Sequence, residues 1–317
     1  MLYTFFNNPS FLIDYIYIIK NKAGKLIIYG LISYLAQLLL VGMPPLVGLD
    51  LIYSLYGLII ISTLRFIWLI ILIIKYSRIT ISFPFLKKYI STSTPLIFSI
   101  LISGSAQYID GLIISSYYKD ESFFAVFRYG ARELPLLLLA DAFSNAMIPE
   151  ISNNNINVSL KKIKRKSLNI MHIVFPVTIL LLLTSHWFYP AIFTDAFKDS
   201  AIIFNTYLLL TITRLVFPQT ILIGKRKNFP VLFSALTEFV INLVLSLILI
   251  QYLGLVGVAI ATFFAYLTDK LILIFFNMRD KIMPSSYIPI SWLGFYSLII
   301  LMLYLITDWN LFNISIQ

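Results

Sequence analysis

The sequence predicts an all-α protein, a polytopic bundle of about nine membrane-spanning helices. Hydrophobic residues make up 60% of the 317 residues and charged residues only 12%, about half the charged share of an average soluble domain. This apolar content is sufficient for roughly nine helices of about 20 residues each. Lys and Arg also alternate between the two sets of loops that such helices would have. A soluble enzyme, a disordered regulator and a secreted disulfide-linked domain are therefore excluded.

Nine apolar segments are long enough to cross a bilayer. We expect the spans at about 26–46, 51–74, 90–116, 122–149, 168–192, 201–223, 229–251, 256–277 and 288–307. The stretch 11–19 contains Asp14 and is too short to cross, so we expect an interfacial helix there or the end of a further span. Gly130, Pro135 and Pro218 lie inside spans, where a helix bundle tolerates them as packing sites or kinks.

The connections between these spans differ sharply in basic content. Those at one end carry 17 of the 24 Lys and Arg residues, with the longest basic run at 161–166. Those at the other end carry only Lys119 and Lys198. Because basic loops stay in the cytoplasm, we expect the first span to run outward and the C-terminus to lie outside. The net charge of +10 is then a topology signal, so no nucleic-acid partner is expected.

The chain has few groups suited to covalent or metal chemistry. It contains no cysteine, and its two histidines, His172 and His186, are far apart in the sequence. No nucleotide-binding loop is present, and the predicted loops are too short to form a soluble domain. We therefore expect neither a metal nor a cofactor, and a transport protein rather than an enzyme.

Ten charged residues fall inside the predicted spans, where each costs about 2.5–3.5 kcal/mol at helix centre on insertion scales. They are Arg65, Asp110, Arg128, Arg132, Glu133, Asp141, Arg214, Glu238, Asp269 and Lys270. Two interpretations remain open: neutralised clamps that hold helices together, or the lining of a water-filled cavity for a charged head group.

Depth in the membrane predicts which of these charges meet. Asp110 lies at the depth of Arg128 and Arg132 in the next span, and Arg214 lies at the depth of Glu238, each ten residues from the turn 224–228. Arg128 and Arg132 are four residues apart, on one face of a continuous helix. Two guanidinium groups so placed are suited to the oxygens of a diphosphate.

Several segments resemble bacterial polysaccharide-export flippases. Residues 86–96 (LKKYISTSTPL) and 108–114 (YIDGLII) are similar to the seventh span of that family. Residues 127–135 (FRYGARELP) resemble its next span, and 254–262 (GLVGVAIAT) resembles a recurrent helix start. On these motifs the chain is identified as a member of the Wzx-like O-antigen flippases, within the multidrug/oligosaccharidyl-lipid/polysaccharide exporter superfamily.

The resemblance implies a division into lobes. Residues 1–85 would be a remnant of the N-terminal lobe without its first four spans, 86–283 a complete six-helix C-terminal lobe, and 284–317 an additional span with an outer tail. It also implies a multi-pass protein of the bacterial inner membrane that flips an undecaprenyl-diphosphate-linked oligosaccharide, a substrate for lipopolysaccharide. No oligomeric state is implied.

Depth, spacing and side-chain chemistry predict roles for individual residues within such a flippase. Arg128 and Arg132 would contact the substrate with Asp110 orienting them, Arg214 and Glu238 would form an inner charge pair or gate, and Asp141 is a candidate coupling carboxylate. Alternative functions are a cation-coupled multidrug exporter of the same architecture, a membrane-embedded glycan polymerase or ligase, and a chain that is inactive by itself.

Overall fold

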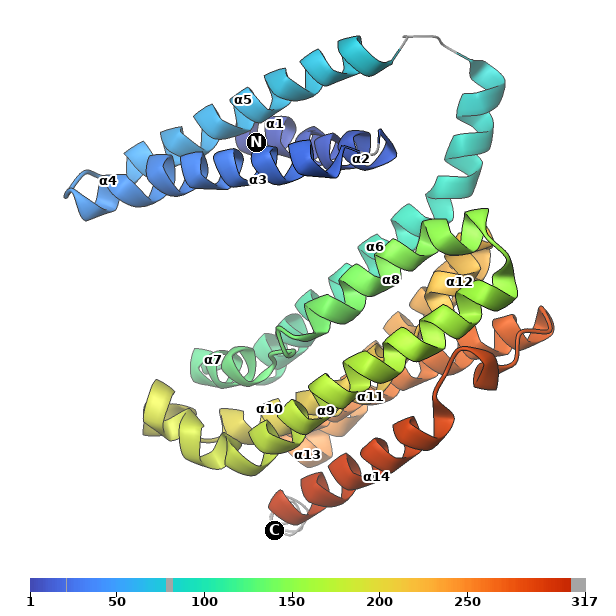
Figure 1. The fold of residues 1–317 in the computed structure, drawn as a ribbon. Coiled ribbons are helices and arrows are strands. Elements are labelled where there is room, and N and C mark those ends of the chain that lie inside the picture. Colours follow the sequence, from blue (N-terminus) through green and yellow to red (C-terminus); the bar gives the residue numbers. More distant parts are fainter. Residues whose placement is uncertain (21, 78–81, 309–317) are drawn as a thin grey trace. The chain divides into compact units, whose positions relative to one another are not determined.

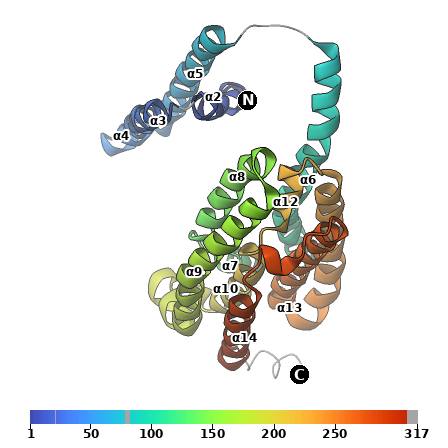
Figure 2. The ribbon, with the colours of Figure 1, turned by 45° about the vertical axis from the view of Figure 1, so that its right-hand side comes forward.

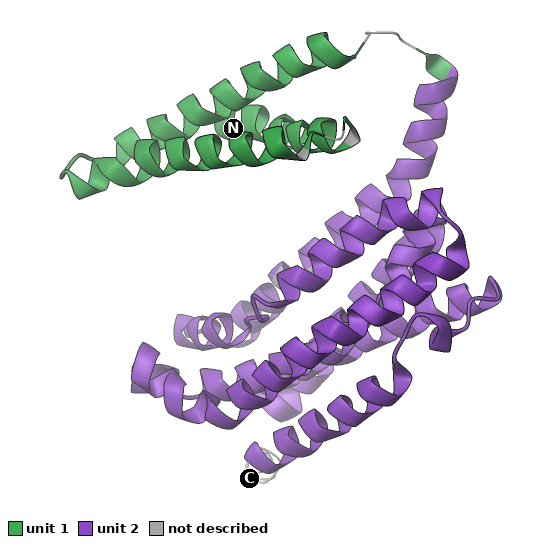
Figure 3. Ribbon diagram, in the orientation of Figure 1, with its two compact units in different colours: residues 1–83 green, residues 84–317 purple. Residues whose placement is uncertain are grey.

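The computed structural model describes residues 1–317 except 21, 78–81 and 309–317, and every regular element in this described part is helical (Figure 1). The predicted all-α fold class is confirmed. Two compact units are present, residues 1–83 and 84–317 (Figure 3). The division lies close to the predicted boundary at 85/86. The third predicted segment, 284–317, is part of the second unit.

Unit 1 is built on a hairpin of two long helices. α3 (Ala23–Gln37) continues through the π-helical turn η1 (Leu38–Gly42) into α4 (Met43–Leu46), and α5 (Leu51–Tyr76) returns beside α3 (Figure 1). These helices correspond to the predicted spans 26–46 and 51–74. The short helices α1 (Leu2–Ser10) and α2 (Leu12–Ile19) pack on this hairpin. Ile13 and Tyr17 of α2 are buried against Leu69 and Leu72 of α5.

Unit 2 contains the remaining helices, several of which lie side by side with similar axes (Figure 2). In chain order they are α6 (Phe83–Tyr117), α7 (Glu121–Gly130), α8 (Leu137–Asn153), α9 (Ile156–Phe193), α10 (Ser200–Leu208), α11 (Leu210–Arg214), α12 (Pro218–Gly224), α13 (Phe229–Arg279) and α14 (Ile290–Thr307), with the 3₁₀ turns η2 (Asp195–Phe197) and η3 (Pro284–Ser286). Its core is apolar and fully buried around Phe175, Met171, Leu182, Leu215 and Ile221.

Six helices in the described part are long and apolar enough to cross a membrane, and the bent pair 200–214 and 218–224 is a seventh candidate. α13 has 51 residues, about 75 Å if it were straight, which is far more than one bilayer requires. It instead doubles back at Gly254, whose φ of 57° is not helical. Asn242 and Thr262 thereby come within 3.4 Å of each other although they are 20 residues apart. The predicted spans 229–251 and 256–277 are the two arms of this hairpin.

Three predicted segments differ from the structure. The span 201–223 is not one helix, because it is divided into α10, α11 and α12 with a 45° bend before α12. The span 122–149 is not one helix, because α7 ends at Gly130 and α8 begins at Leu137. The expected loop 151–167 is mostly helix, because α9 begins at Ile156, two turns or more ahead of its apolar part. Its basic residues form polar turns of α9 that extend past the apolar section.

α14 is tied to the rest of unit 2 by polar contacts near its C-terminus. Asp308 accepts hydrogen bonds from Asn205 (3.0 Å) and lies 2.8 Å from His186 Nε2. Tyr304 and Thr206 are joined through their hydroxyl groups at 2.9 Å. These contacts join the end of α14 to α9 and α10.

The opposite end of unit 2 collects the basic turns, and we call it the basic end: the turn between α8 and α9, the turn 225–228 and the connection 280–289. Asp280 accepts hydrogen bonds there from Lys225 (2.8 Å) and Lys227. Partial burial raises the pKa of Asp280, but the two ammonium groups outweigh that effect and keep the pKa below its ordinary value. The ionised carboxylate therefore joins two connections of the fold.

The lowered pKa of Asp280 predicts a pH-dependent contribution to stability. Because the folded-state pKa is depressed, the stabilisation is complete above the ordinary Asp pKa of about 3.9 and is lost as pH falls through the lower folded value. We expect Asp280→Asn to lower the thermal unfolding temperature at pH 7 by a few degrees, since a partly exposed ion pair contributes about 1 kcal/mol or less. The difference from wild type should shrink as the pH falls below about 3.9 and vanish once the pH is below the folded-state pKa, and a difference that stays unchanged throughout would contradict the assignment.

Candidate functional site

A break between α7 and α8 interrupts the membrane segment that carries Arg128, Arg132 and Glu133. α7 ends at Gly130, and the chain runs without helix from Ala131 to Leu136 before α8. Pro135 lacks the N–H that a continuous helix would need, and the residue before a proline avoids the helical region. The sequence therefore ends one helix and starts another inside an apolar segment. Such breaks are tolerated at membrane depth only where protein or a cavity surrounds them.

A second break separates α11 from α12. α11 ends at Arg214, and α12 starts with Pro218 in its first turn after a 45° bend. Side chains bond two carbonyl groups at this break, Leu215 O between the helices and Pro218 O in the first turn of α12. Ser167 donates to Leu215 O at 3.0 Å, and Asn277 donates to Pro218 O at 2.9 Å. The break is thus held by polar side chains of α9 and α13.

The two breaks meet through one ion pair. Arg214 Nη2 lies 2.5 Å from Glu133 Oε1 and 3.0 Å from the hydroxyl of Tyr266. The guanidinium carbon is also 4.5 Å from the centre of the Tyr266 ring, within the range of a cation–π interaction. Both charged side chains are 24% exposed. A charged, partly accessible contact therefore joins the α7–α8 break, the α11–α12 break and the second arm of α13.

Further ionisable groups lie on the two arms of α13. Asp269 and Lys270 pair at 3.0 Å, and both side chains are largely buried. Glu238, on the other arm, is 4% exposed, and its Oε1 has no hydrogen-bond partner among the described residues. Its carboxyl group is within electrostatic reach of Asp269, Lys270 and Arg214. We call Glu133, Arg214, Glu238, Asp269, Lys270 and Tyr266 the charged cluster.

Asp110 is at the centre of a separate buried network. Its two carboxyl oxygens accept from Asn242 Nδ2 at 2.9 Å and from Thr262 Oγ1 at 3.1 Å. Ser246 lies 3.3 Å from the side-chain oxygen of Asn242. Asp110 is 1% exposed. The network ties α6 to both arms of α13.

The predicted charge pairs are corrected by these contacts. Asp110 is bonded to Asn242 and Thr262, not to Arg128 or Arg132, and the partner of Arg214 is Glu133, not Glu238. The faces that helices turn to one another decide which groups meet, and the sequence does not show those faces. Glu133 reaches Arg214 because the break frees it from the helical register.

The predicted arginine fork also differs. Arg128 is on the last turn of α7 and Arg132 is in the break, so the two do not share the face of one helix. Both are exposed, and neither forms an ion pair with another described residue. Asp141 is exposed on α8. Their roles as substrate contacts or as a coupling group remain predictions.

Sequence reasoning did not identify Tyr266, Asn242 and Thr262 as site residues. One signal in the sequence could have indicated Tyr266: it lies about one helical turn from the charged residues Asp269 and Lys270. Within the described residues, no group of three or more His, Cys, Asp or Glu side chains is arranged to hold a metal ion.

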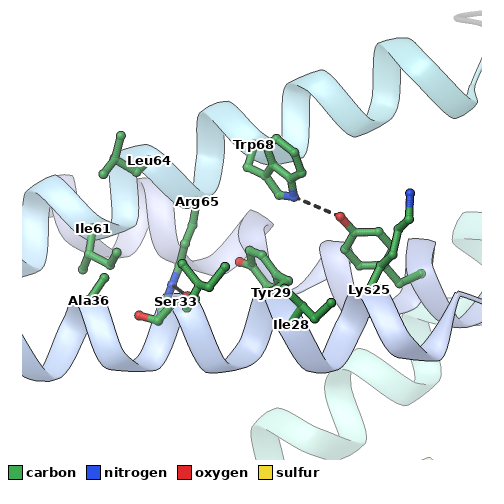
Figure 4. A pocket seen from close by; sticks show the side chains of 11 residues that line it. Lys25, Ile28, Tyr29, Ser33, Ala36, Ile61, Leu64, Arg65 and Trp68 are labelled. Carbon is green, nitrogen blue, oxygen red and sulfur yellow. Dashed lines mark hydrogen bonds between the residues drawn. The ribbon is translucent and has the colours of Figure 1, made fainter.

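Unit 1 contains a cavity of about 480 Å³ between α3 and α5 (Figure 4). Apolar side chains line most of it, with Arg65 and Lys25 as its cationic members. Trp68 Nε1 donates to the hydroxyl of Tyr17 at 3.2 Å (Figure 4). Arg65 is held by Ser33 (2.5 Å) and Gln37 (2.8 Å), which makes it a hydrogen-bonded clamp between the two helices.

Discontinuous helices that meet at buried charges are typical of membrane transporters, in which such breaks form the substrate and ion sites. The chain belongs to the polysaccharide biosynthesis protein family, whose model matches residues 17–202. This finding confirms the resemblance to polysaccharide-export proteins.

Among solved structures, the chain is similar to the lipid II flippase MurJ in an inward closed conformation. The identity is 22% and the TM-score 0.53, and the alignment covers 95% of this chain and 71% of that chain. At this identity the likeness shows a shared fold. No curated protein matches the sequence.

The Asp110 network yields a stability test. Thr262→Val removes one of the two hydrogen bonds to a buried carboxylate, and we expect a loss of about 1–3 kcal/mol in the free energy of unfolding. Thr237→Val is the matched control, because Thr237 is half-buried and donates only to Phe233 O of its own helix. Denaturation of the purified protein in detergent measures both, and equal effects of the two substitutions would contradict the proposed network.

Proposed function

We propose that the protein is a flippase for a lipid-linked oligosaccharide, with an undecaprenyl-diphosphate carrier, in the bacterial inner membrane. The proposal is supported first by membership in the polysaccharide biosynthesis protein family. The MurJ-like fold is compatible with it. The observation that carries it is the contact between two helix breaks through Arg214 and Glu133, which remain a quarter exposed inside an apolar bundle.

Moving a diphosphate across a bilayer requires cationic groups in a place shielded from lipid. Arg132 lies next to Glu133 in the α7–α8 break and is exposed. Arg128 is on the turn of α7 just before that break. A guanidinium group binds phosphate oxygens in a bidentate manner, more strongly at low dielectric. We therefore assign Arg132 and Arg128 to contact with the diphosphate or with acidic sugars.

The Arg214–Glu133 pair is suited to a gate. It joins segments on either side of two helix breaks, and short non-helical segments of this kind absorb the backbone changes of a hinge. Breaking the pair would free Arg214 for the substrate while the two breaks move apart. Asp141, exposed on α8, is the candidate for cation coupling.

Transport by the Arg132→Gln variant tests this function. We expect at least a tenfold slower rate, because one charge-assisted contact contributes about 1.5–3 kcal/mol. The assay follows a fluorescent undecaprenyl-diphosphate glycan in proteoliposomes, with an impermeant quencher reporting which leaflet it occupies. Arg165→Gln, at an exposed arginine of α9, is the matched control and should transport at the wild-type rate.

A wild-type rate for Arg132→Gln would exclude Arg132 from the substrate path. Wild-type protein that does not move the glycan but moves cationic dyes would identify the alternative function, a multidrug exporter.

A further inference from the structure

The basic end of unit 2 contains a cavity of about 720 Å³ that is separate from the charged cluster. Three connections line it: the turn between α8 and α9, the turn between α12 and α13, and the connection from α13 to η3. Its apolar lining includes the buried side chains of Ile151, Leu160 and Ile282. Polar donors are supplied by Ser152, Asn157 and Ser286.

The charge of this cavity is predominantly positive. Lys225, Arg226 and Lys281 line it together with one carboxylate, Asp280. That carboxylate is already bonded to Lys225 and Lys227. Arg226 and Lys281 are exposed and form no ion pair with any other residue that the structure describes. Arg226 and Lys281 therefore line the same cavity as two cations without an acidic partner in the described part of the chain.

Both cations occupy backbone positions that favour glycine. Arg226 has a φ of 60° and Lys281 a φ of 61°. Each follows the end of a helix in the same type of turn: Lys227 N bonds to Leu222 O, and Ile282 N bonds to Asn277 O. In this turn the left-handed position is usually glycine, because a side chain there is strained. The turns themselves therefore do not account for an arginine and a lysine at these positions.

We propose that this cavity binds a phosphate-bearing anion through Arg226 and Lys281. The planar guanidinium group of Arg226 can donate hydrogen bonds to two phosphate oxygens. The ammonium group of Lys281, on the other turn, adds a second positive charge. The apolar wall lowers the local dielectric and strengthens both interactions. The anion is either the head group of an acidic lipid, which a basic protein surface attracts, or a soluble phosphate.

Thermal unfolding of the purified 317-residue chain tests the site, with inorganic phosphate added at constant ionic strength. A second arm places the protein in nanodiscs of phosphatidylglycerol or of phosphatidylcholine. The variants are Arg226→Gly and Lys281→Gly, which remove the charge and relieve the turn, so that they remain folded. Arg279→Gln is the matched control, because Arg279 is exposed nearby and does not line the cavity.

We expect both glycine variants to unfold at a higher temperature than wild type without phosphate. Their phosphate- or phosphatidylglycerol-dependent stabilisation should be lost, with apparent affinity at least about tenfold weaker, while Arg279→Gln keeps it. A response to phosphate identifies a soluble anion, and a response to phosphatidylglycerol alone identifies a lipid head group. Equal responses in wild type and both glycine variants, or no response of the wild type to either probe, would overturn the proposal.

Discussion

The ion pair between Arg214 and Glu133 is the contact on which the account of this protein depends. In an apolar bundle, water does not satisfy the backbone groups that a broken helix exposes, nor the charges that lie beside them. Two breaks placed together supply each other with partners. The pair, the Tyr266 ring and the side chains of Ser167 and Asn277 make the interruption of two membrane helices tolerable.

The same requirement shapes the rest of unit 2. Asp110 is buried with two donors from the α13 hairpin, and Asp308 is buried with Asn205 and His186 at the other end of the bundle. At the basic end, Asp280 holds two connections through two lysines. Each carboxylate thus fastens helices that are distant in the sequence. Glu238 is the exception among these buried acids, because one of its oxygens has no partner in the described part of the chain.

The sequence predicted much of this architecture because apolar length and loop charge are local properties. The helices α3, α5 and α14 and the two arms of α13 lie where the apolar segments indicated. The α7–α8 break was not predicted, although Gly130 and Pro135 were visible in the segment. Hydropathy measures composition over a window, so it does not detect where an apolar segment stops being helical.

The sequence did not predict which of the buried charged residues pair with each other, and the reason is different. Arg214 and Glu238 were predicted to lie at equal depth, but depth is one coordinate, and the rotation of each helix about its axis decides which side chains meet. That rotation is set by packing of many side chains at once. The energetic cost of charges in the membrane was enough to select these ten residues from the sequence as candidates for the site, whereas the pairing of Glu133 with Arg214 required the structure.

A double-mutant cycle on Glu133 and Arg214 tests the central contact most directly. The free energy of unfolding is measured in detergent for Glu133→Gln, Arg214→Gln and the double variant, with a second cycle on Glu238 and Arg214 for comparison. We predict a coupling energy of about 1–3 kcal/mol for the first cycle and a much smaller one for the second. Additive effects at Glu133 and Arg214, within about 0.5 kcal/mol, would show that the two helix breaks are not held together by this pair.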